Sequence, residues 1–90
     1  MKRYVIERDL PSVGGMSSDE LSGASQKSNA ALAELAPRVQ WEHSYVTGDK
    51  TFCIYLAEDV AAIEEHARIS GFPATKVTEV KTIIDPTTGG

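Results

Sequence analysis

The sequence predicts an α+β domain of the ferredoxin-like type, with the element order β-α-β-β-α-β. Two stretches carry small or apolar residues at helical spacing, and each begins with residues that cap helices. Four further stretches are rich in β-branched and aromatic residues. In such a fold both helices cover one face of a four-stranded antiparallel sheet, so the other face must meet water, a ligand or a partner.

The first strand is expected over residues 3–8, because turn-forming residues follow it. A helix should come next, with Ser17 as its N-cap and Glu20 at the third helical position, which together form a capping box. Pro37 disfavours helical backbone at the residue before it. The first helix is therefore expected to end near Ala36.

A β-hairpin is expected over residues 39–46 and 51–57, since both runs are rich in strand-forming residues. The residues between them include Gly48 and Asp49, which suit a tight type II′ turn. With that turn His43 pairs with Ile54, and every other pairing in the hairpin follows from it.

The second helix is expected over residues 59–70, because acidic residues precede it and Gly71 suits the left-handed position after a helix. A last strand over residues 77–84 should end at Asp85-Pro86. All 90 residues are thus expected to form one domain, with a loose tail from about residue 85.

Alternation along the hairpin sorts its side chains into two faces. One face is rather apolar and should hold Trp41, His43, Tyr45, Phe52, Ile54 and Leu56. The other face is mixed and should hold Glu42, Ser44, Cys53 and Tyr55, joined by Val5 and Glu7 from the first strand. This mixture suits a dimer cavity, in which two sheets close over a small wet chamber lined by Ser44 and Tyr55.

Composition argues against several classes of partner. The formal net charge is −4, and the nine lysines and arginines form no basic run, so nucleic acid is not expected. The chain shows neither a signal-peptide pattern nor an apolar stretch long enough to span a bilayer, so a cytoplasmic location without membrane contact is expected. A domain this small buries little surface, which favours association into a homodimer.

The side chains suited to a transition metal are few, and we consider His43, His66, Cys53, Glu7 and Glu42. None of them has a diagnostic metal-binding spacing. A homodimer would supply each ligand twice.

Each candidate also has a structural interpretation. His43 fits a partly buried, hydrogen-bonded histidine, and His66 fits a cation at the C-terminal end of a helix. Cys53 fits a small buried apolar residue, because a thiolate would need a nearby cation. Glu7 is the strongest candidate for a functional acid, whereas Tyr55 could equally donate its hydroxyl into the chamber or pack at an interface.

A set of short motifs resembles a known family. They are Trp41, Ser44-Tyr45-Val46-Thr47, Asp49-Lys50, Cys53-Ile54-Tyr55, Glu65-His66-Ala67, Gly71-Phe72-Pro73-Ala74 and Ile84-Asp85-Pro86-Thr87-Thr88. The chain is similar to a family of small bacterial proteins classed as a domain of unknown function, some of whose members are described as nickel-binding. The resemblance implies a ferredoxin-like protomer that dimerises through its sheets into an α/β barrel, and it implies nickel as the bound metal.

Three functions follow from these observations. The favoured one is a homodimer that binds nickel, or another divalent transition metal, in or near the dimer cavity. The first alternative is a small enzyme of the dimeric barrel type acting on an organic ligand, which requires a deep pocket and a titratable group with a perturbed pKa. The second alternative is a non-catalytic dimeric interaction module, which requires a cavity filled by side chains.

Overall fold

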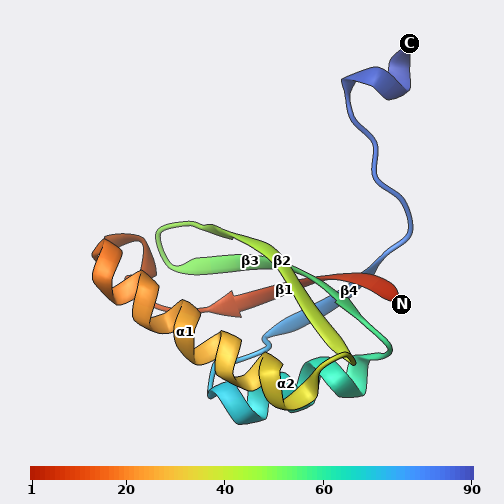
Figure 1. The fold of residues 1–90 in the computed structure, drawn as a ribbon. Coiled ribbons are helices and arrows are strands. Elements are labelled where there is room, and N and C mark those ends of the chain that lie inside the picture. Colours follow the sequence, from red (N-terminus) through yellow and green to blue (C-terminus); the bar gives the residue numbers. More distant parts are fainter.

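The sheet has four antiparallel strands in the spatial order β2-β3-β1-β4, as the computed structural model of residues 1–90 shows (Figure 1). Its strands are β1 (Lys2–Asp9), β2 (Val39–Val46), β3 (Lys50–Ala57) and β4 (Lys76–Val80). Both helices, α1 (Ser18–Leu35) and α2 (Val60–Ser70), lie on the same side of this sheet (Figure 1). The predicted ferredoxin-like order is confirmed, and short 3₁₀ turns are added at η1 (Val13–Gly15) and η2 (Pro86–Gly89).

The helix ends follow the predicted capping chemistry. Glu20 donates its backbone N–H to Ser17 Oγ over 3.2 Å, and its carboxylate accepts from the Ser17 N–H over 3.1 Å. Asp59 caps α2 by accepting the backbone N–H of Ala62 over 2.9 Å. Gly71 ends α2 with a φ of 80°, in the left-handed region where a side chain would be strained.

The last strand is shorter than the predicted range of residues 77–84, because β4 ends at Val80. Val80 pairs with Arg3, which lies one residue inside the beginning of β1. Later residues therefore have almost no neighbouring backbone to pair with, and the chain runs away from the sheet (Figure 1). Ile84 is 76% exposed as a result.

The hairpin turn is not the predicted type II′ turn. That turn needs a positive φ at Gly48, and Gly48 has none. The Thr47 side chain closes the turn instead. Its hydroxyl accepts the Lys50 N–H over 3.2 Å and donates to the Lys50 carbonyl over 2.8 Å.

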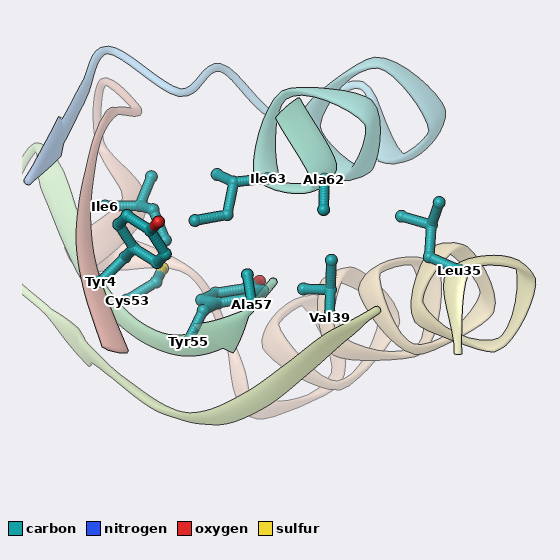
Figure 2. Close-up of a cluster of buried hydrophobic side chains, with 9 residues drawn as sticks. All are labelled: Tyr4, Ile6, Leu35, Val39, Cys53, Tyr55, Ala57, Ala62 and Ile63. Atoms are coloured by element: carbon teal, nitrogen blue, oxygen red, sulfur yellow. The ribbon is translucent and has the colours of Figure 1, made fainter. Parts of the chain in front are cut away.

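The core fills the space between the helices and the sheet (Figure 2). Side chains from β1 and β3 point toward those of α2 and the end of α1 (Figure 2). Nine buried residues form this cluster, namely Tyr4, Ile6, Leu35, Val39, Cys53, Tyr55, Ala57, Ala62 and Ile63.

The η1 turn packs closely against the hairpin turn, which yields a stability prediction for Gly14→Ala. The Gly14 N–H donates to the Gly48 carbonyl over 2.9 Å, and a Cβ on Gly14 would lie 2.6 Å from the backbone carbonyl oxygen of Thr47. We expect Gly14→Ala to lower the free energy of unfolding by about 1–3 kcal/mol. Denaturant unfolding measures this change.

Gly15→Ala is the matched control, because a Cβ there meets no atom within 4 Å. It should change the free energy of unfolding by no more than about 0.5 kcal/mol. Equal effects of the two variants would contradict the close approach of η1 to the hairpin.

Candidate functional site

A β-bulge in β2 decides which side chains face the helices. His43 pairs with Ile54 as predicted, but the register shifts between His43 and Trp41, so that Trp41 pairs with Tyr55. The prediction had placed Glu42 opposite Tyr55 and Trp41 beside His43, and both placements are wrong. Trp41 packs against the helix-covered core, and its Nε1 donates to Ser44 Oγ over 2.9 Å.

The predicted placement of Val5 and Glu7 on the mixed face is also wrong. Glu7 pairs with Phe52, and Val5 pairs with Ile54, so both lie on the sheet face that no helix covers. Cys53 and Tyr55 lie on the opposite face, in the core. No single face therefore holds the six residues that were expected to share a dimer cavity.

His43 lies on the open face of the sheet and is exposed. Its Nε2 lies 3.2 Å from the Tyr45 hydroxyl, and the two rings meet edge to face with centroids 5.1 Å apart. The partly buried alternative for His43 is thus wrong. The surrounding face is rich in half-buried or exposed apolar side chains, namely Val5, Tyr45, Phe52, Ile54 and Leu56.

The two carboxylates near this face are held by cations. Arg3 Nε donates to Glu42 Oε1 over 2.7 Å, and this hydrogen bond is the main reason why the pKa of Glu42 lies below its ordinary value. Lys50 Nζ lies 3.8 Å from a Glu7 carboxylate oxygen. Both acids therefore present partly accessible carboxylate oxygens on the open face.

His66 lies in the interior and is fully buried. Its Nε2 lies 3.1 Å from Ser28 Oγ, which is itself 3.4 Å from the Tyr55 hydroxyl. Burial, and then the positive charge of Arg8, lowers the pKa of His66 to about 4. The helix-end cation interpretation is wrong, because a histidine with this pKa is neutral at pH 7.

Cys53 is buried in the core beside Thr51, whose Oγ1 lies 3.5 Å from its sulfur. This position agrees with the interpretation of Cys53 as a small buried apolar residue.

The five candidate metal ligands do not come together within one chain. His43, Glu42 and Glu7 belong to the open face, whereas His66 and Cys53 are buried on the helix-covered side of the sheet. No group of three or more histidine, cysteine, aspartate or glutamate side chains in the chain is placed to hold a metal ion. One chain alone thus offers no complete site.

The helix-covered side contains a pocket of about 430 Å³ between the sheet, the first half of α1 and the loop around η1. Ser44 and Tyr55 line it, so these two residues line a pocket within one chain and not the predicted cavity between two chains. Arg8 lines it as well, and sequence reasoning missed this residue. The available signal was that Arg8 follows Tyr4 and Ile6 at the two-residue spacing of an inward-facing strand position.

The fold and these residues define a small ferredoxin-like α+β protein with an open sheet face that bears a histidine and with a pocket under its first helix. The chain belongs to the family described as "Nickel responsive protein SCO4226-like", which it matches over residues 4–80.

Among solved structures the chain is similar to the crystal structure of SCO4226 from Streptomyces coelicolor A3(2), with a TM-score of 0.76. The two share 18% sequence identity over 91% of this chain and 99% of that one, a likeness that shows the fold alone. No curated protein matches the chain significantly. Neither of its helices is both long and apolar enough to cross a bilayer.

Proposed function

We propose that this protein binds a divalent transition metal, nickel in the first place, as a homodimer whose open sheet faces meet, with His43 as the principal ligand. The observation that carries the proposal is the exposed imidazole of His43 on an apolar sheet face that no helix covers. Membership in a family described as nickel responsive supports nickel as the metal.

The composition of the open face supports dimerisation. Tyr45 is 60% exposed, and half-buried Phe52, Ile54 and Leu56 lie on the neighbouring strand. Apolar side chains of this kind are stabilised when a second sheet removes them from water. Because His43 lies on this same open face, a second copy of the chain packed against it would bring a second His43 to the interface.

The chemistry of the donors fits nickel. Imidazole is a good ligand for Ni²⁺, and Glu42 and Glu7 add carboxylate oxygens on the same face. Arg3 pairs with Glu42, and Lys50 pairs with Glu7. In this proposal the two carboxylates act either as direct ligands or as groups that orient the site. No three of these side chains come together in one chain, so the proposed site needs ligands from both chains, which together would supply two imidazoles and four carboxylates.

His66 and Cys53 are structural residues in this proposal. Both are buried on the far side of the sheet from His43, and His66 Nε2 already interacts with Ser28. A metal ligand needs an accessible lone pair, and these two side chains offer none to the open face.

The test is a nickel titration of tag-free protein by calorimetry, with the oligomeric state measured by sedimentation velocity. We expect saturable binding by a dimer, and we expect His43→Ala to weaken it by at least about tenfold, as is typical for the loss of a metal-site residue. His66→Gln is the matched control and should bind nickel as the wild type does. A monomeric protein, or a His43→Ala variant with unchanged affinity, would refute the proposal.

A further inference from the structure

We propose that the pocket under α1 binds a small organic monocarboxylate with an apolar body, and that Arg8 holds its carboxylate. This site goes beyond nickel binding and does not depend on it. The pocket lies on the helix-covered side of the sheet, whereas His43 lies on the opposite face.

Arg8 is a buried cation without an acidic partner. Only 3% of its surface is exposed, and none of the ion pairs in the chain includes it. Its Nη1 donates to the carbonyls of Phe72 and Pro73 over 3.3 and 2.9 Å, while its Nη2 has no hydrogen-bond partner. A buried guanidinium is destabilising unless an anion and further hydrogen bonds compensate it, so a bound anion would satisfy it.

The charge around Arg8 matches a ligand with one negative charge. Arg8 is the only charged residue that lines the pocket, and no aspartate or glutamate contributes to the wall. His66 is held neutral nearby. Its hydrogen-bond partner Ser28, and Tyr55, which is in turn within hydrogen-bond distance of Ser28, both line the pocket and offer hydroxyl groups. A planar carboxylate can take two N–H donors from one guanidinium. A phosphate dianion would bring a second charge that no other cation in this wall could balance.

The rest of the pocket suits an apolar body. Its volume of about 430 Å³ is in the range of small-molecule sites. Aliphatic and aromatic side chains form most of its wall, among them Leu10, Val13, Leu21, Trp41 and Phe72. Since this space is not filled by side chains, burial of an apolar ligand would add to the interaction of its carboxylate with Arg8.

The only tryptophan of the chain, Trp41, lines the pocket and reports on its occupancy. We would titrate the full chain with 3-phenylpropanoate and octanoate, and with the corresponding neutral amides, while following tryptophan emission. We expect a saturable change with at least one acid, and at least about tenfold weaker binding of its amide, because the charge-assisted hydrogen bonds are lost. No saturable change with either acid by about 5 mM, or equal affinity for acid and amide, would overturn the proposal.

Three variants separate the pocket from nonspecific effects. Arg8→Met should weaken binding of the acid by at least about tenfold. Ala24→Met keeps Arg8 but fills part of the pocket from its wall, and it should likewise weaken binding of the acid by at least about tenfold. Arg68→Met removes a surface cation that pairs with Glu65 outside the pocket, and it should leave the affinity unchanged.

The outcome is distinguishable from that of the nickel proposal. Arg8→Met should retain nickel binding, whereas His43→Ala should retain binding of the acid. Because the comparison of acid with amide uses the wild-type chain, it tests binding of the carboxylate even where a variant does not fold. Full retention of acid affinity by folded Arg8→Met would overturn the role of Arg8.

Discussion

Acidification from pH 7 to pH 4.5 is expected to lower the free energy of unfolding by about 2 kcal/mol, because His66 must stay neutral in the folded chain. Its pKa is about 4 when folded, against an ordinary value of 6.5 in the unfolded chain. The elements packed around it contribute Arg8 from β1, Ser28 from α1 and Tyr55 from β3. None of these offers a negative charge that would stabilise an imidazolium.

The sign of the effect follows from proton binding. Between pH 6.5 and about 4 the unfolded chain binds a proton at His66 and the folded chain does not, so stability rises with pH across this window. Carboxylates whose pKa is lowered by ion pairs or hydrogen bonds begin to lose their stabilising effect as the pH approaches their ordinary values of 4.5 or 3.8, and they lose it fully below their lowered values. The range above pH 4.5 therefore reports mainly on histidine.

Denaturant unfolding at pH 7, 5.5 and 4.5 measures this dependence. In His66→Gln the loss of stability should largely disappear, because glutamine does not titrate. His43→Gln is the control, since its imidazole is exposed on the other side of the sheet, and it should retain the wild-type loss. An unchanged loss in His66→Gln would show that His66 is not the group responsible.

Most of the element order was predictable from sequence because its signals are local. The capping box of Ser17 and Glu20 and the left-handed Gly71 act within a few residues of a helix end. The end of β4 was not predictable in this way. Residues 82–84 have strand-forming side chains, yet the length of β4 depends on where β1 begins, which no local pattern records.

The faces of the sheet were predicted less well because they depend on pairing between distant strands. One extra residue at the bulge in β2 moved Trp41 to the helix-covered face. The first strand was assigned by parity without knowledge of its partner, and Glu7 pairs with Phe52 and not with a residue of the core face. The pocket was missed for a related reason. A charged residue in a strand is usually exposed to solvent, and only the three-dimensional structure shows that the loop around η1 lies beside Arg8 and forms part of the pocket.

Truncation of Ile6 to alanine is expected to lower the free energy of unfolding by about 2–5 kcal/mol, the largest effect of the substitutions considered. Ile6 is fully buried, and it lies on an interior strand between Cys53 of β3 and Val77 of β4. Figure 2 shows its side chain within the core cluster. The cavity cannot easily close, because both neighbouring strands are fixed by their backbone hydrogen bonds.

Such a loss would be a large fraction of the total free energy of unfolding, which is roughly 5–13 kcal/mol for a chain of 90 residues. Ile84→Ala removes the same atoms from a side chain that is 76% exposed, and it should change stability by no more than about 0.5 kcal/mol. Denaturant unfolding of the two variants compares buried with exposed isoleucine directly. If Ile6→Ala were as stable as Ile84→Ala, the core would not depend on the packing of β1 against the helices, and the position of Arg8 on the same face of that strand would lose its support.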